Sequence, residues 1–178
     1  MIDSRLALVL KAAAFAAEKH RDQRRKDRHA TPYINHPLAL AQILSVEGDV
    51  QDAEVIAAAI LHDTIEDTNT TADELRRVFG DRIASMVVEV TDDTTTDKKT
   101  RKDLQIRHAP HLSDGAKLVK LADKIANLRD MAHNPPHDWG TTRRREYFDW
   151  AGKVIDGLRG AHPGLEAKFD EIVREGRP

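Results

Sequence analysis

Four ionisable side chains fall within one short segment of the sequence, HDTIED at residues 62–67. At 3.6 residues per turn, His62 and Glu66 share one face of a helix, and Asp63 and Asp67 share the next. The segment directly follows the most apolar run of the chain. Because burying unpaired charges is costly, these side chains need a bound cation, a hydrogen-bond network or solvent. A solvated helix end is the alternative that the segment leaves open.

Two more polar residues stand where they could add metal ligands. His36 directly precedes a proline that could begin a helix, and Asp123 is followed four residues later by Asn127 on the same helical face. Taken alone, a histidine such as His36 is more often a cap or a packed core residue, and a single aspartate on a helix such as Asp123 is usually a surface acid. Combined with His62 and Asp63, they give two imidazoles and two carboxylates from three helices. This set suits a divalent ion such as Mn²⁺, Fe²⁺ or Zn²⁺ and leaves positions for water or phosphate.

Basic residues are concentrated in two segments of a nearly neutral chain. The sequence has 28 Lys and Arg against 30 Asp and Glu, a net charge of −2, so its bulk charge does not predict a nucleic-acid-binding surface. Residues 18–28 and 98–102 are nevertheless rich in Lys and Arg. Such patches suit a compact polyanion such as a nucleotide, and the alternative is solvated helix ends and loops.

Length and composition limit the class of protein. A chain of 178 residues is about one domain long. It has no Cys, which excludes disulfides, a thiol nucleophile, a Cys-ligated zinc and an iron–sulfur cluster. The phosphate-binding signatures G-x-x-x-x-G-K-[ST] and G-x-G-x-x-G are absent from it. Neither a membrane span nor a signal segment is evident, and we expect a cytoplasmic protein with no membrane partner.

The elements that must position these side chains are expected to be helices. Almost every ordered stretch has apolar residues at helical spacing, which predicts an all-α protein with a single domain over residues 1–178. The segment MVVEV could be a strand, but the spacing of its flanks favours a helix. Trp139 is interpreted as a loop anchor, with a role in an interface as the alternative. We expect loops over 92–103 and 133–141, and helices over 6–17 (after an Asp3/Ser4 cap), 37–46, 52–67, 71–80, 83–90, 117–131, 147–158 and 163–172.

Five motifs in order carry a resemblance to a known family. The H…HD…D pattern resembles the metal-ligand signature of the HD superfamily of metal-dependent phosphohydrolases. More narrowly, the chain is similar to the hydrolase domain of RelA/SpoT homologues and to the stand-alone small alarmone hydrolases, a group that includes the metazoan SpoT homologues. The similarity runs from about residue 8 to about residue 170. Its motifs are RRKD at 24–27, TPYINHP at 31–37, LHDTIEDT at 61–68, EVTDD at 89–93 and GAKLVKLADKIANLRD at 115–130.

The resemblance implies a fold, a reaction and a set of site residues. It implies an HD-domain helical bundle that uses one Mn²⁺ to hydrolyse the 3′-pyrophosphate of (p)ppGpp, giving GDP or GTP and pyrophosphate. Arg25 and Lys26 would bracket the base and the phosphates, and Asn127 would approach the ribose or the scissile phosphate. Tyr147 would line the nucleotide pocket, and Lys98 is expected to contact a phosphate. The implied metal ligands are His36, His62, Asp63 and Asp123, and the implied catalytic acids are Glu66 and Asp67.

The residues also support such chemistry on their own terms. A bound divalent ion lowers the pKa of a water molecule and polarises a phosphoryl oxygen. Glu66 or Asp67 could orient that water or accept its proton, and the sequence leaves open which acid is the base. Two alternatives stay open: an HD phosphatase acting on another nucleotide such as ppApp, NADPH or a deoxynucleotide, and a non-catalytic helical binding module. The intact acids of the 62–67 segment count against a module that only binds. The expected partner is a small nucleotide rather than a nucleic acid, and the oligomeric state is open.

Overall fold

The computed structural model describes residues 4–178, and this part of the chain is built from helices, which confirms the all-α prediction. In these residues the β-structure is a single antiparallel bridge between Arg24 and Pro32. The elements in order are α1 (Ser4–Lys19), α2 (Asn35–Gln42), the π-helix η1 (Ile43–Glu47), α3 (Ala53–Leu61), α4 (Thr64–Asp67), α5 (Ala72–Phe79), α6 (Asp81–Val90), α7 (Lys98–His108), the 3₁₀-helix η2 (Ala109–His111), α8 (Asp114–His133), α9 (Thr141–Asp156) and α10 (Pro163–Gly176).

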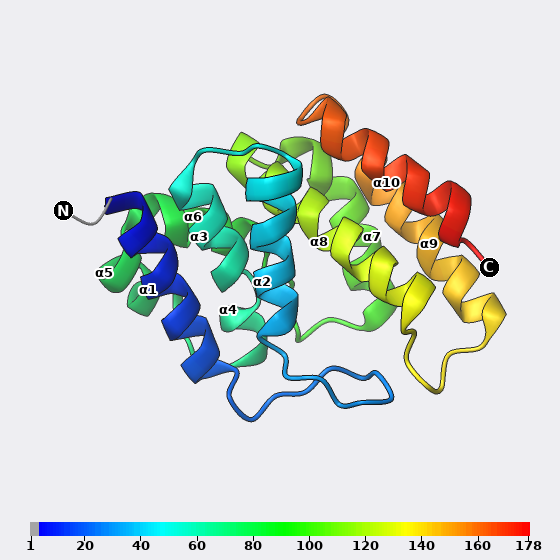
Figure 1. The fold of residues 1–178 in the computed structure, drawn as a ribbon, viewed down its shortest axis with the longest axis horizontal. Coiled ribbons are helices and arrows are strands. Elements are labelled where there is room, and N and C mark those ends of the chain that lie inside the picture. Colours follow the sequence, from blue (N-terminus) through cyan, green and yellow to red (C-terminus); the bar gives the residue numbers. More distant parts are fainter. Residues whose placement is uncertain (1–3) are drawn as a thin grey trace.

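Helices α3 and α8 lie at the centre of the arrangement (Figure 1). Helix α3 packs against α1, α2, α6 and α8, and α8 also packs against α9 and α10. Three fully buried alanines, Ala57, Ala58 and Ala59, lie in the middle of α3. Such short side chains let neighbouring helices approach closely, so the end of α3 is surrounded by other elements. The C-terminal end of α3 therefore lies against the middle of α8, where Lys120, Asp123 and Lys124 are buried.

Side-chain caps set the start of several helices. The Asp52 carboxylate accepts hydrogen bonds from the backbone N–H groups of Glu54 and Val55 at the start of α3. Ser113 does the same for Ala116 in α8. Each cap satisfies N–H groups that have no partner within the helix, which is worth about 1 kcal/mol. The caps thus fix where the two central helices begin.

The loop expected over residues 92–103 is wrong from Lys98 onward. Asp97 accepts hydrogen bonds from the N–H groups of Lys99 and Thr100, and α7 begins there. None of the residues of α7 is buried, so the helix lacks the apolar stripe by which a helix is detected in a sequence. The helix interpretation of MVVEV is confirmed, because it forms the second half of α6.

Two other expected helices are interrupted. The helix expected over 52–67 breaks at His62 and Asp63, between α3 and α4. Thr64 Oγ1 donates to the carbonyl of Leu61, which stabilises this break. The helix expected over 37–46 changes to the π-helix η1. Asp3 lies outside the described residues, and Ser4 begins α1. Within residues 4–178, no helix combines the length and the apolar character needed to cross a bilayer.

Candidate metal centre and adjoining cleft

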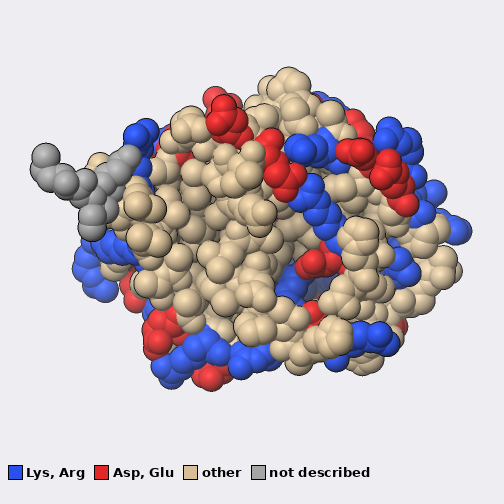
Figure 2. Space-filling model, in the orientation of Figure 1, with Lys and Arg blue, Asp and Glu red and all other residues tan. Residues whose placement is uncertain are grey.

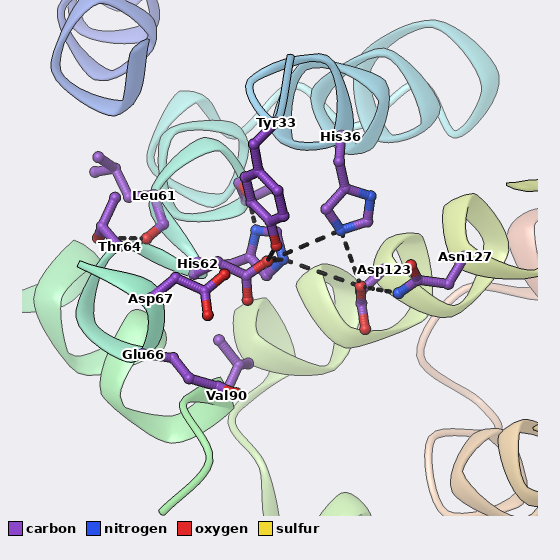
Figure 3. Close-up of polar contacts among 12 residues, drawn as sticks. Tyr33, His36, Leu61, His62, Thr64, Glu66, Asp67, Val90, Asp123 and Asn127 are labelled. Carbon is purple, nitrogen blue, oxygen red and sulfur yellow. Dashed lines mark hydrogen bonds and ion pairs between the residues drawn. The ribbon is translucent and has the colours of Figure 1, made fainter. Parts of the chain in front are cut away.

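Three separate parts of the fold bring two imidazoles and two carboxylates together (Figure 3). His36 is at the start of α2, His62 and Asp63 form the break between α3 and α4, and Asp123 lies in the middle of α8. His36 Nε2 is 3.3 Å and His62 Nε2 is 3.9 Å from Asp123 Oδ1. Asp63 Oδ2 is 2.8 Å from His62 Nε2 and 4.0 Å from His36 Nε2. The four side chains that the sequence singled out as ligands therefore share one centre.

These separations fit the coordination shell of one divalent ion. With ligand atoms at about 2.1 Å from a metal, neighbouring ligands are about 3 Å apart and opposite ones about 4 Å apart. Among the described residues, ligand atoms of His36, His62 and Asp123 all lie within 4.8 Å of one another. His62 Nδ1 is 2.8 Å from the carbonyl oxygen of Ala59, to which it donates, so the lone pair of Nε2 is available. Nε2 of His62 is buried and lies close to Asp63, but it makes no hydrogen bond of acceptable geometry. A nitrogen atom that binds a metal is expected to lack such a bond. The donor set fits a divalent metal.

The buried charges alter each other's protonation. Burial alone would raise the pKa values of Asp63 and Asp123, but the neighbouring cationic groups outweigh it and hold both below the usual range. Burial opposes protonation of His62, yet the charges of Asp63 and Asp123 raise its pKa. Burial lowers the pKa of His36. The centre thus keeps its carboxylates ionised, which is the state in which they bind a cation.

Further groups hold the two carboxylates in place. The Tyr33 hydroxyl donates a short hydrogen bond to Asp63 Oδ2. Asn127 Nδ2 donates to Asp123 Oδ1 at 2.5 Å, and Lys124 Nζ donates to Asp123 Oδ2 at 3.0 Å. Such outer contacts orient ligands and tune a metal site. The sequence did not single out Tyr33 or Lys124, although both lie inside the motifs TPYINHP and LADKIAN.

The two acids expected to be catalytic lie beside this centre on α4. Glu66 Oε2 accepts from the backbone N–H of Asp92 at 3.1 Å, and Asp67 Oδ2 accepts from Gln23 Nε2 at 2.8 Å. Burial raises the pKa of Glu66 to about 7, with the charges of Asp92 and Asp63 adding to this effect. A carboxylate with a pKa near neutrality is suited to accept a proton from water at physiological pH.

A cleft of about 720 Å³ opens next to the candidate ligands, within the size range of small-molecule sites. Its walls include Arg25, Lys26, Asn127 and Tyr147, four of the five residues that the resemblance assigned to the nucleotide. Asp63, Glu66 and Asp67 also line it, so the acids face the same space. A hollow with acidic and basic atoms on its walls is visible beside α2 in Figure 2. The cleft therefore joins the metal centre to the outside.

Arg25, one of the basic residues of the cleft, is held by neighbouring side chains. Arg25 Nη2 lies 2.5 Å from Asp130 Oδ2 and 3.3 Å from Asn127 Oδ1. Its guanidinium stands over the Tyr33 ring, 5.8 Å from the ring centroid. The fork of Arg25 is thus fixed beside the candidate metal centre.

The fifth nucleotide candidate, Lys98, lies at the edge of the cleft at the start of α7. Its Nζ is 5.5 Å from the ring centroid of Trp139, a residue of the cleft wall. Burial lowers the pKa of Lys98, and the charges of Arg143 and Lys26 lower it further. The two basic segments of the sequence therefore meet in space. Trp139 also packs edge-on against Tyr147 at 5.7 Å and against the core, in agreement with a loop anchor.

Comparisons with known proteins agree with one another. A family model described as an HD domain matches residues 12–149. The chain is 56% identical over 174 residues to guanosine-3′,5′-bis(diphosphate) 3′-pyrophosphohydrolase MESH1 of Xenopus tropicalis, covering 98% of this chain and 97% of that protein. It is 51% identical over 172 residues to the Homo sapiens protein of the same name, covering 97% and 96%. A solved structure, described as a metazoan orthologue of SpoT that hydrolyses ppGpp, superposes with a TM-score of 0.92 at 48% identity and covers 95% of both chains.

Proposed function

Because the chain belongs to the HD-domain family and, within it, to the group of the MESH1 pyrophosphohydrolases, we propose that it hydrolyses the 3′-pyrophosphate of guanosine 3′,5′-bis(diphosphate), ppGpp. The products are GDP and pyrophosphate, or GTP and pyrophosphate from pppGpp. The observation that carries the proposal is the convergence of His36, His62, Asp63 and Asp123 beside a cleft that contains Glu66 and Asp67. A cytoplasmic location and a single domain over residues 1–178 are part of the same proposal.

His36, His62, Asp63 and Asp123 would hold the divalent ion, and we propose Mn²⁺ for this position. The mixed nitrogen and oxygen donors support a first-row ion of this kind. When bound, such an ion polarises a phosphoryl oxygen and makes a water molecule more acidic. The Tyr33 hydroxyl and the Asn127 amide keep the Asp63 and Asp123 carboxylates turned towards the centre.

Glu66 and Asp67 supply the acid–base chemistry in this proposal. Both carboxylates line the cleft, one helical turn after the candidate ligands. Because the pKa of Glu66 lies at about 7, it is able to accept a proton from the attacking water near neutral pH and to return it to the leaving group. Asp67 is held by Gln23 and would orient the water or the phosphoryl group.

The basic residues of the cleft would bind the anionic substrate. The planar fork of Arg25 can stack on a purine or hold a phosphate at two points, whereas Lys26 acts as a point charge. Lys98 adds a further positive charge from α7 for a more distant phosphate. Asn127 and Tyr147 complete the wall nearest to the candidate metal.

Product analysis tests this function. The purified chain is incubated with ppGpp in the presence of Mn²⁺, Mg²⁺, Fe²⁺ or Zn²⁺, and the products are separated chromatographically. We expect GDP and pyrophosphate in equal amounts with Mn²⁺ and none with a chelator. D63A should lose turnover, because it removes a ligand. Absence of GDP under all four metals, or undiminished turnover by D63A, would contradict the proposal.

A nucleotide panel tests the substrate class. The same assay with ppApp, NADPH and a deoxynucleoside triphosphate measures pyrophosphate and phosphate release. We expect the highest kcat/KM with ppGpp. Turnover of one of the other nucleotides with ppGpp inert would replace the proposed substrate, and tight ppGpp binding without turnover would indicate a binding module.

A further inference from the structure

A buried histidine outside the candidate metal centre is connected to one of its acids. His20 directly follows α1 and is only 2% exposed. Its Nδ1 lies 2.6 Å from Gln23 Oε1, and Gln23 Nε2 donates to Asp67 Oδ2 at 2.8 Å. A continuous path of two hydrogen bonds therefore leads from the end of α1 to α4.

The direction of both hydrogen bonds is determined by the carboxylate. An ionised Asp67 can only accept, so the amide nitrogen of Gln23 faces it and the amide oxygen faces His20. That oxygen can only accept, so His20 must carry its proton on Nδ1. His20 Nε2 is buried without a hydrogen-bond partner, which costs less as a bare lone pair than as an N–H group. The surroundings thus select one tautomer of His20.

The path is fixed along its length by the backbone and by ring packing. The N–H of Gln23 donates to the carbonyl of His20 at 2.9 Å, and the N–H of Tyr33 donates to the carbonyl of Gln23 at 3.1 Å. The His20 ring packs against the Tyr33 ring at an interplanar angle of 34°, with 4.8 Å between centroids. The backbone of Gln23 is therefore fixed, and its side chain bridges His20 and the Asp67 carboxylate at the end of the short helix α4.

We propose that His20 is a positioning residue of the hydrolytic site: by donating to Gln23 it fixes the amide that orients the Asp67 carboxylate in the cleft. This inference rests on the proposed function. His20 itself is kept from the cleft by Gln23 and Tyr33, so its loss affects the orientation of Asp67 and not the binding of the nucleotide. A misplaced catalytic group lowers the rate of the chemical step, so we expect loss of His20 to lower kcat and to leave KM nearly unchanged.

Two substitutions separate hydrogen bonding from packing. In H20N, the side-chain nitrogen of Asn can occupy the place of Nδ1 and keep the donor, but the ring that stacks on Tyr33 is lost. In H20F, the ring is kept and the donor is lost. We expect H20F to lower kcat roughly 10-fold or more with KM nearly unchanged, and H20N to keep kcat within about threefold of the wild type. Any other pattern overturns the proposal, including an active H20F with an impaired H20N, which would indicate packing alone.

A double substitution tests whether His20 acts through Gln23. Q23L removes the amide, and we expect H20F to add no further loss of kcat in the Q23L background. Independent, multiplying losses would mean that His20 acts by another route. H29F, at an exposed histidine of the following loop, is the matched control and should leave kcat unchanged.

A measurement without substrate keeps this inference separate from the proposed function. The ¹⁵N chemical shifts of the His20 imidazole, assigned by their loss in H20N, report its tautomer in the chelator-treated chain. We expect Nδ1–H, and an Nε2–H tautomer would overturn the path even if ppGpp is hydrolysed. Should the wild type fail to turn over ppGpp, the proposed function falls, while the tautomer still decides whether the path exists.

Discussion

Glu66 on α4 accepts a hydrogen bond from the backbone N–H of Asp92, two residues beyond the end of α6, with 3.1 Å between nitrogen and Oε2. The same end of α6 is tied to α8, because Lys120 Nζ donates to the carbonyl of Val90 at 2.9 Å. Burial raises the pKa of Glu66 to about 7, while the Asp92 N–H lowers it. The environment of Glu66 therefore depends on contacts among α4, α6 and α8.

The first prediction concerns the stability of E66Q. Because the pKa of Glu66 is raised above its ordinary value of 4.5, the folded state binds the proton more tightly than the unfolded state. The stabilising contribution is present below pH 4.5 and is lost as the pH rises through about 7. Gln stays neutral, so the unfolding free energy of E66Q relative to that of the wild type should increase from pH 5 to pH 8. Urea unfolding in chelator at these two pH values measures the difference.

The control for this prediction is E171Q, at an exposed glutamate of α10. We expect its stability relative to the wild type to change less between the two pH values. An E66Q difference that is constant with pH, or that decreases as the pH rises, would contradict a raised pKa for Glu66.

The second prediction concerns Lys120, which is buried in α8 and whose pKa is lowered by this burial. K120M leaves the Val90 carbonyl without its donor, which costs roughly 1–3 kcal/mol of unfolding free energy. The end of α6 that carries the Asp92 N–H then loosens, and we expect kcat to fall while KM changes little. Urea unfolding and steady-state kinetics measure the two effects. K117M, one turn earlier on α8, is the control, and an unchanged kcat in K120M would limit Lys120 to a structural role.

The third prediction compares two glycines of the α9 region. A Cβ on Gly157 would lie 2.9 Å from the Cβ of Ala109 and 3.0 Å from Cδ of Pro110, neither of which can rotate away. We expect G157A to destabilise the protein by about 1–3 kcal/mol. A Cβ on Gly152, inside α9, meets nothing within 4 Å, so G152A should stabilise it by up to about 1 kcal/mol. Thermal unfolding of both variants checks this, and equal effects would contradict the close packing of α9 on η2.

The helices that the sequence predicted correctly are those in which buried apolar residues recur at helical spacing. The period of Ile83, Val87 and Val90 places α6, and these residues are indeed in the core. Helix α7 has no buried residue, so it shows no apolar period in the sequence. Its remaining sequence signal is the Asp97 cap, which is hard to recognise in a run of polar residues. The break after Leu61 was missed because helical spacing continues through it, whereas a contact of Thr64 with that carbonyl interrupts the helix.

Helical spacing alone predicted the residue types of the candidate site but not their grouping in space. Spacing places His62 and Glu66 on one turn, but it cannot bring Asp123 near them, since Asp123 lies 61 positions after His62 in the chain. The ordered motifs supplied this grouping. The supporting contacts of Tyr33 and Gln23 depend on how the loop before α2 folds back over α4, and such side-chain contacts have no periodic signal in the sequence.

The last prediction concerns the hydrogen bond between Tyr33 and Asp63. Y33F keeps the ring, and therefore the stacking on His20, but removes the hydroxyl that donates to Asp63 Oδ2. The carboxylate then loses the donor that turns it towards His62, and loss of such an outer contact weakens metal binding by about 10–100-fold. Isothermal titration of the chelator-treated protein with Mn²⁺ measures the affinity.

The matched control for Y33F is Y147F, which removes a hydroxyl from the other tyrosine of the cleft. Within the described residues no hydrogen bond joins Tyr147 to the four candidate ligands, so we expect Y147F to bind Mn²⁺ as the wild type does. Because Tyr33 acts on a ligand and Tyr147 faces the space for the nucleotide, Y33F should change the Mn²⁺ dissociation constant and Y147F the KM for ppGpp. Equal Mn²⁺ affinities for Y33F and Y147F would mean that Asp63 is held without the Tyr33 hydroxyl or does not bind the metal.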